Sequence, residues 1–164
     1  KPVRLKALPV LDLISHVLML STLLLLSAYM VYDPAPREVW LLVISVSLIS
    51  AYGQLYNQVR DYEADQAAGL HNTASLLGKS GTQRLGYAML VIALGCLLAS
   101  ILSGAFPLWL GGVLLVVVPL VRRVVRGRDM RGDASEDPLA DGQVQFLLAA
   151  NLVLVAWLGV VLVS

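Results

Sequence analysis

Long apolar blocks dominate the chain and define its predicted elements. Five stretches contain no Asp, Glu, Lys or Arg: residues 17–32, 39–56, 85–103, 105–121 and 144–163. Each is 16 to 20 residues long, close to the roughly 20 that a helix needs to cross the hydrocarbon core of a bilayer. The first block reaches that length if it begins near Val10 and includes Asp12 and His16. Barrel strands alternate polar and apolar residues and these blocks do not, so we expect an all-α, polytopic membrane bundle of five transmembrane helices.

Composition agrees with a membrane protein. The 164 residues are 58% hydrophobic and 14% charged, whereas soluble domains carry about a quarter charged residues. No linker or internal repeat divides the chain, so we expect residues 1–164 to belong to a single domain, with the lipid bilayer as its surroundings and no nucleic-acid partner. Because the chain begins with Lys1, we also expect it to be part of a longer protein.

The distribution of positive charge predicts the orientation of the helices. Eleven of the twelve Lys and Arg residues fall in the N-terminal arm, in the connection 57–84 or at 122–131, and Arg37 alone falls on the opposite side. Segments rich in Lys and Arg stay in the cytoplasm. We therefore expect a multi-pass protein of the cell (inner) membrane whose arm and two polar connections face the cytoplasm.

Polar side chains form a stripe along the second predicted helix. At 100° per residue, and with Asp61 taken as zero, seven polar residues fall within an arc of roughly 100°. They are Ser47, Ser50, Gln54, Asn57, Gln58, Asp61 and Asp65. Polar groups in a membrane span are costly and normally face a bundle interior or a water-filled cavity. The stripe therefore predicts a pocket that opens to the cytoplasm.

Two carboxylates at the cytoplasmic end of the stripe indicate a metal site. Asp61 and Asp65 are spaced i, i+4 and point the same way, so they repel each other unless a cation lies between them. Mg²⁺ is the hard cation that binds one or two carboxylates together with substrate phosphates. Nearby basic residues on the same side can neutralise the remaining phosphate charge; these are Arg4, Lys6, Arg60, Lys79 and Arg84.

The sequence alone allows two roles for each of the charged or titratable residues beside the stripe. Asp12 and His16, also spaced i, i+4, either form a structural hydrogen bond or border the pocket. Glu63 lies on the opposite face of the helix from Asp61, where it pairs with Arg60 or faces water.

We expect the second helix to continue out of the membrane as far as Gly69. The spacing of residues 80–83 (Ser-Gly-Thr-Gln) predicts a capping box that starts the third span.

The run from Tyr56 to Gly69, YNQVRDYEADQAAG, resembles the second aspartate-rich motif of the UbiA superfamily of intramembrane prenyltransferases. Thr73 and Gly78 follow at spacings often found in that family, and the arm 2–12 resembles the basic stretch before its fifth helix. The resemblance covers essentially the whole chain, as helices five to nine of a nine-helix fold.

The resemblance implies transfer of a prenyl group from a polyprenyl diphosphate to a small-molecule acceptor, aromatic or otherwise lipophilic, with Mg²⁺ as cofactor. It implies that Asp61, Asp65 and Asn57 bind the metal, and that Asp61 and Asp65 are the catalytic pair. Lys6 and Arg60 would contact the diphosphate, and Gln54, Gln58 and Asn57 would line the substrate pocket.

The sequence departs from the family pattern in two places. Gln58 stands where many members have Asp, which lowers the number of possible metal ligands. The first motif, of the type Asn-Asp-x-x-Asp-x-x-x-Asp, does not occur in these 164 residues. We therefore expect this chain to supply half of an active site completed by N-terminal helices of the same protein, and to be inactive alone. The alternative function is a cation-coupled transporter that uses Asn57, Asp61 and Asp65 as its ion site.

Overall fold

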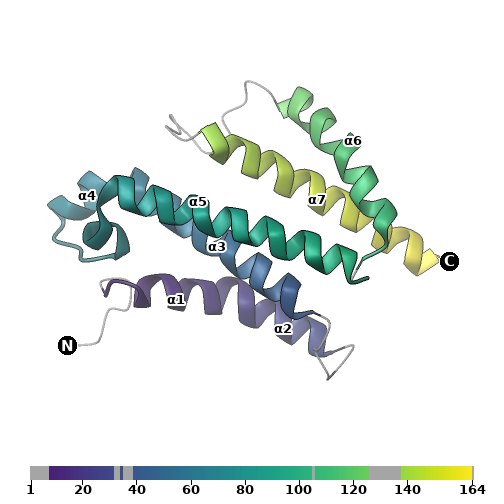
Figure 1. The fold of residues 1–164 in the computed structure, drawn as a ribbon, viewed down its shortest axis with the longest axis horizontal. Helices are drawn as coiled ribbons and strands as arrows, with labels where there is room; N and C mark the ends of the chain where they lie inside the picture. Colours follow the sequence, from purple (N-terminus) through teal and green to yellow (C-terminus); the bar gives the residue numbers. More distant parts are fainter. Residues whose placement is uncertain (1–7, 32–33, 35–38, 105, 126–137, 164) are drawn as a thin grey trace. The chain divides into compact units, whose positions relative to one another are not determined.

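The computed structural model describes residues 8–31, 34, 39–104, 106–125 and 138–163, and every regular element in these residues is a helix. The expected all-α class is confirmed (Figure 1). In chain order the elements are α1 (Leu11–Val17), the π-helical turn η2 (Leu18–Thr22), α2 (Leu23–Met30), α3 (Trp40–Arg60), α4 (Tyr62–Ala67), α5 (Thr73–Leu102), α6 (Leu108–Val125) and α7 (Pro138–Val163). They form two units, Lys1–Ala105 and Phe106–Ser164, which are described separately.

Helices occupy all five of the predicted apolar spans. α1, η2 and α2 follow one another without a break, and Leu11–Met30 and Thr73–Leu102 are each long and apolar enough to cross a bilayer. Shorter apolar stretches lie in the second unit, at Leu108–Val121 and Leu148–Val160. α3 has 21 residues, a sufficient length for a span, but its polar stripe makes it less apolar than the other two.

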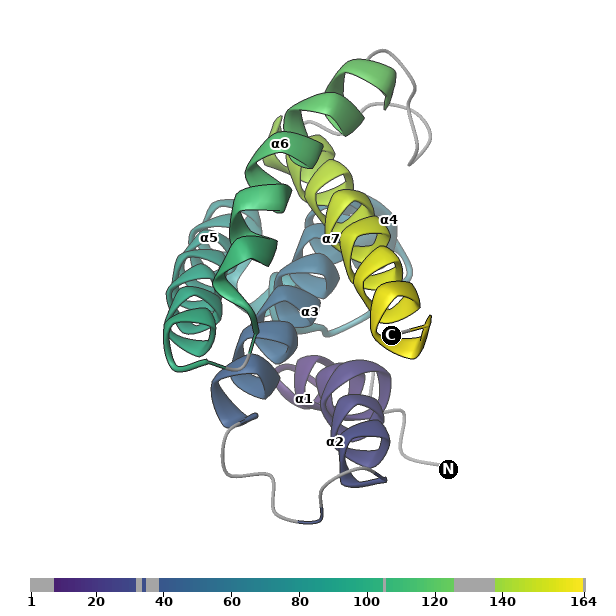
Figure 2. The ribbon, with the colours of Figure 1, turned by 90° about the vertical axis from the view of Figure 1, so that its right-hand side faces the viewer.

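α3 is the central helix of the first unit. It packs against α5 along much of its length and against α1 on another side, so it lies between them (Figures 1 and 2). Leu13, Ala51 and Leu55 form the apolar core where the three helices meet. Gly86 of α5 permits close approach to α3, since a Cβ at this position would lie 3.2 Å from the Tyr52 ring. Small residues often allow helices to pack closely in membranes.

Two caps define the connection between α4 and α5. At the end of α4, Leu70 N donates to Asp65 O at 2.9 Å and Gly69 N donates to Gln66 O at 3.0 Å. These bonds form a Schellman motif, in which Gly69 takes the left-handed conformation at φ 67°. The expected end of this helical segment near Gly69 is confirmed.

The next helix begins earlier than its sequence spacing predicts. Asn72 is the N-cap of α5, and its side chain accepts a hydrogen bond from Ser75 N at 2.9 Å. α5 nevertheless consists of two helical segments joined across a kink, and the second segment begins close to the predicted Ser80. The capping-box hydrogen bond expected at Ser80 is absent from the described residues. A break in helical geometry does occur nearby, at Gly78 (φ 70°, ψ 165°).

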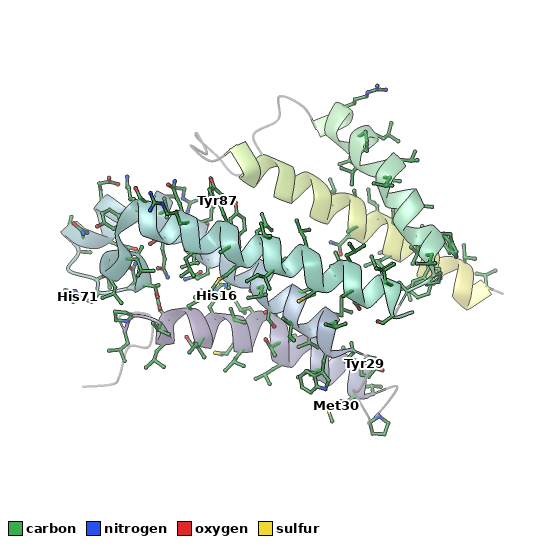
Figure 3. The ribbon with its side chains drawn as sticks, viewed as in Figure 1. His16, Tyr29, Met30, His71 and Tyr87 are labelled. Carbon is green, nitrogen blue, oxygen red and sulfur yellow. The ribbon has the colours of Figure 1, made fainter. Side chains whose placement is uncertain are left out.

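The polar connection lies at one end of the first unit. His71, labelled in Figure 3, belongs to this connection, and Tyr29 and Met30 lie at the opposite end of the same unit. The aspartate-rich segment therefore occupies the end of α3 that is remote from the end of α2.

The second unit consists of α6 and α7. An open apolar pocket of ≈ 270 Å³ lies between them, and it is lined by Trp109, Val113, Val117, Leu152, Val153, Ala156, Trp157 and Val160. Phe106 and Trp157 pack edge to face, with ring centroids 6.4 Å apart.

The cap at Gly69 yields a prediction about stability. Gly69→Ala places a Cβ in the left-handed conformation, so we expect the free energy of unfolding to fall by about 1 kcal/mol. Unfolding of the detergent-solubilised protein by SDS titration measures this change. Gly95→Ala is the matched control, since no atom lies within 4 Å of the added Cβ. An equal loss in both variants would show that the Gly69 conformation is not the cause.

Candidate active site

The three predicted metal ligands lie on successive helical turns. Asp61 N donates to Asn57 O at 2.9 Å, and Asp65 N donates to Asp61 O at 2.8 Å. Helical hydrogen bonding therefore continues across the junction between α3 and α4, where Asp61 has φ −90° and ψ 8°. Asn57, Asp61 and Asp65 consequently share one face of the helical segment.

One edge of the polar stripe is used to join α3 and α4 to other elements. Three members of this edge have side-chain partners elsewhere in the first unit: Ser47 with Thr22 at 2.6 Å, Gln58 with Asp12 at 2.6 Å and Asp65 with Asn72 at 2.7 Å. On the helical wheel these members lie at about 40° to 60° from Asp61. This edge therefore faces the neighbouring segments.

The other edge of the stripe keeps its polar groups available. Within the described part of the chain, the side chains of Ser50, Gln54 and Asn57 make no hydrogen bond, and Asn57 is exposed. Among the same described residues, the Asp61 carboxylate accepts hydrogen bonds only from the neighbouring Arg60. Polar groups without protein partners on a membrane helix need water, a ligand or further helices. This edge is the part of the stripe that can receive a ligand.

Gln58 belongs to a buried network rather than to the open edge. Its side chain is 5% exposed; Nε2 donates to Asp12 Oδ2 at 2.6 Å, and Oε1 accepts from Ala74 N at 3.0 Å. Both ends of the amide are thus engaged by protein groups, so Gln58 links α3 to α1 and to the start of α5.

Asp12 is the centre of this network. Its carboxylate is 4% exposed and accepts four hydrogen bonds, two on each oxygen. Leu13 N (2.8 Å) and Thr73 Oγ1 (2.6 Å) donate to Oδ1, and Gln58 Nε2 (2.6 Å) and Thr73 N (3.0 Å) donate to Oδ2. A buried carboxylate is tolerated when hydrogen bonds compensate for lost hydration. Among the described residues no bond joins Asp12 to His16, so the option of a hydrogen bond between these two is wrong.

The backbone of Val10 is strained, and the Asp12 network holds it in place through Thr73. It has φ 68° and ψ −44°, an outlier for a β-branched residue that costs on the order of 1–3 kcal/mol. Its N–H donates to Thr73 Oγ1 at 2.9 Å. The Thr73 hydroxyl therefore accepts from Val10 and donates to Asp12, which fixes the point where the N-terminal arm enters α1.

The exposed charges near the site form local pairs. Arg60 Nε donates to Asp61 Oδ1 at 3.0 Å, with the two side chains 45% and 47% exposed. The hydrogen bond with Asp61 raises the pKa of Arg60, so the guanidinium stays charged. Lys79 Nζ lies 2.5 Å from Glu63 Oε1, and this hydrogen bond lowers the pKa of the Glu63 carboxyl. Glu63 therefore pairs with Lys79 and not with Arg60, and such exposed pairs contribute little to stability.

The donor set fits a magnesium ion that has further ligands from a substrate. The described residues contain no group of three or more His, Cys, Asp and Glu side chains that could hold a metal. Asp61 and Asp65 nevertheless provide two carboxylates on one face, and Asp65 Oδ1 has no hydrogen-bond partner in this part of the chain. Mg²⁺ usually binds one or two carboxylates plus waters and phosphate oxygens. The predicted diphosphate contact Lys6 lies outside the described residues.

Sequence reasoning missed the role of Asn72. This residue is 5% exposed and uses both ends of its amide, since Oδ1 caps α5 and Nδ2 donates to Asp65 Oδ2. The signal was present in the sequence, because Asn is a preferred N-cap residue. Ser80, with its capping-box spacing, gave the competing signal.

The long apolar helices of the fold and a carboxylate pair at a helix end fit a membrane-embedded enzyme. The model of the UbiA prenyltransferase family matches residues 2–139, and the chain belongs to this family. Family membership supports a membrane-integral prenyltransferase. No curated protein and no solved structure matches the chain.

The Asp12 network yields a second prediction about stability. Asp12→Ala leaves the buried N–H groups of Thr73 and Gln58 without an acceptor, so we expect a loss of about 3 kcal/mol in the free energy of unfolding. Ser27→Ala is the control, because Ser27 is exposed and its hydroxyl bonds only to Leu24 O among the residues that the structure describes; this change stays within about 0.5 kcal/mol. SDS titration of both variants measures the difference. Wild-type stability in Asp12→Ala would contradict a central role for this carboxylate.

Proposed function

We propose that this chain takes part in Mg²⁺-dependent transfer of a polyprenyl group from a prenyl diphosphate to a lipophilic acceptor. The observation that carries the proposal is that Asn57, Asp61 and Asp65 occupy successive turns at the end of a helix. Asn57 and Asp61 belong to the open edge of the stripe, and Asp65 lies beside it with one carboxylate oxygen bonded to Asn72. A diphosphate head and an apolar tail match a site that joins carboxylates to apolar helices. The UbiA family match supports the same reaction class.

In this proposal Asp61 and Asp65, assisted by Asn57, hold Mg²⁺ on the diphosphate. The ion would neutralise the leaving diphosphate while positive charge develops on the prenyl carbon, which is electrostatic stabilisation in a water-poor site. Arg60 exchanges its pairing with Asp61 for contact with the diphosphate, and Lys6 contributes a second positive charge. Gln54 belongs to the open edge of the stripe and lies one helical turn before Gln58.

Gln58 has an indirect role in the proposal. Its amide is already engaged by Asp12 and Ala74, so we propose that it supports the site instead of contacting the substrate. A contact between Gln58 and a ligand would have to break buried hydrogen bonds, which is costly.

We further propose that this chain supplies half of the active site. Its 164 residues contain one aspartate-rich motif, and the remaining metal ligands and acceptor pocket would come from N-terminal helices of the same protein. The chain alone is then inactive, and co-expression of those helices restores activity. Family membership favours this function over a cation-coupled transporter built on the same residues.

The positive charges support a cytoplasmic active site in the cell (inner) membrane, and this orientation generates a prediction. In a Cys96→Ala background, we expect His71→Cys to react with a membrane-impermeant maleimide only after the cells are permeabilised. Pro34→Cys, between the first two spans, is the matched control and reacts in intact cells. Both positions are exposed in the structure. Labelling of position 71 in intact cells would reverse the proposed orientation.

The metal assignment predicts a selective loss of activity. In the protein as its gene encodes it, we expect Asp61→Asn and Asp65→Asn each to lower prenyl transfer at least about a hundredfold, because each loses a charged metal ligand. Membrane insertion remains intact. Turnover of a radiolabelled prenyl diphosphate, measured over a range of Mg²⁺ concentrations, provides the test.

Glu63→Gln is the control for this experiment. It removes a carboxylate from the same helical segment but from the opposite face, where Glu63 pairs with Lys79. We expect its activity to stay within about twofold of the wild type, as surface changes usually have small effects. Near-normal turnover of either Asp variant at limiting Mg²⁺ would show that the ligand assignment is wrong.

A further inference from the structure

The connection between α4 and α5 is held on both sides by one buried carboxylate. Asp12 bonds to Gln58, which precedes Asp61 by three residues, and to both the backbone and the hydroxyl of Thr73. The segment that contains both Asp61 and Asp65 lies between these two attachment points. Asp12 thus fixes the ends of the segment without belonging to it.

Asn72 transmits this restraint to Asp65. It directly precedes Thr73, and its Oδ1 accepts from Ser75 N at 2.9 Å, so the cap of α5 determines the orientation of the amide. With Oδ1 in this position, Nδ2 donates to Asp65 Oδ2 at 2.7 Å. One carboxylate oxygen is therefore held by the protein, whereas Oδ1 of Asp65 has no hydrogen-bond partner in the described part of the chain.

We propose that Asn72, anchored through Thr73 by Asp12, is a positioning residue that orients the Asp65 carboxylate for metal binding. The inference rests on the proposed function, because it assumes that Asp65 is a metal ligand. Hydrogen bonds to a ligating side chain fix its direction, and their removal typically weakens metal affinity 10- to 100-fold. Asn72 acts through Asp65 and does not touch the metal.

A purely structural role for Asn72 makes a different prediction. If Asn72 only caps α5, any replacement that keeps the cap leaves metal affinity unchanged. Ser and Thr are good N-cap residues, but neither side chain has an amide N–H in the position of Nδ2. Asn72→Ser and Asn72→Thr therefore retain the cap and remove the directed bond to Asp65, and the use of two variants guards against a folding defect in one of them.

The experiment measures Mn²⁺ binding to the detergent-purified protein, as its gene encodes it, with inorganic diphosphate present. The electron paramagnetic resonance signal of free Mn²⁺ gives the affinity, and thermal unfolding without metal reports on the fold. We expect the two Asn72 variants to bind Mn²⁺ about tenfold more weakly and still to unfold cooperatively, at a somewhat lower temperature because the hydrogen bond to Asp65 is lost. Gln66→Ala, which removes only a bond to Tyr62 on the exposed face of α4, is the control and retains wild-type affinity.

A double-variant experiment distinguishes an effect of Asn72 that acts through Asp65 from a general effect on Mn²⁺ affinity. In an Asp65→Asn background, we expect Asn72→Ser to cause no further loss of Mn²⁺ affinity. Unchanged affinity in both Asn72 single variants, or an equal loss in the two backgrounds, would overturn the positioning role and leave the metal assignment intact. Wild-type Mn²⁺ affinity in both Asp61→Asn and Asp65→Asn would instead overturn the proposed function, and the positioning role with it.

Discussion

The buried carboxylate of Asp12 is the interaction on which the organisation of the first unit depends. A charge in an apolar bundle is tolerated only when hydrogen bonds replace water, and Asp12 obtains four such bonds from α1, α3 and the start of α5. Because these donors come from three separate segments, the carboxylate sets their mutual positions. The same contacts hold the positive φ of Val10, where the N-terminal arm meets α1.

This network explains how one polar stripe can serve two purposes. Ser47, Gln58 and Asp65 have partners on neighbouring segments, so one edge of the stripe contributes to packing. Gln54, Asn57 and Asp61 lie toward the other edge, where polar side chains are available to a ligand. In a membrane each polar group on a helix must be compensated. The division separates the groups that the protein compensates from those that we propose to bind a ligand, and Asp65, with one oxygen bonded to Asn72, belongs to both sets.

Sequence periodicity predicted the helices, the shared face of Asn57, Asp61 and Asp65 and the helix end near Gly69, because these features follow from local geometry. It could not predict that Gln58 and Thr73 bond to Asp12, since those partners are 46 and 61 residues away in the chain. The i, i+4 spacing of Asp12 and His16 suggested a hydrogen bond between them. Asp12 instead bonds to Gln58 and Thr73, which lie far away in the chain. Likewise, α5 begins at the Asn72 cap, whose side chain has an additional partner in Asp65, and only its second segment, after the kink at Gly78, begins near the predicted Ser80.

The central claim is that Asp61, on the open edge of the stripe, and the adjacent Asp65 bind a metal ion together with a diphosphate. Electron cryomicroscopy of the protein as its gene encodes it, with Mg²⁺ and a non-hydrolysable prenyl thiodiphosphate, tests it most directly. The account predicts a metal ion about 2.1 Å from carboxylate oxygens of Asp61 and Asp65, bridged to the diphosphate, with Asn72 still bonded to Asp65. A bound metal and diphosphate elsewhere, with both carboxylates remote from them, would contradict it.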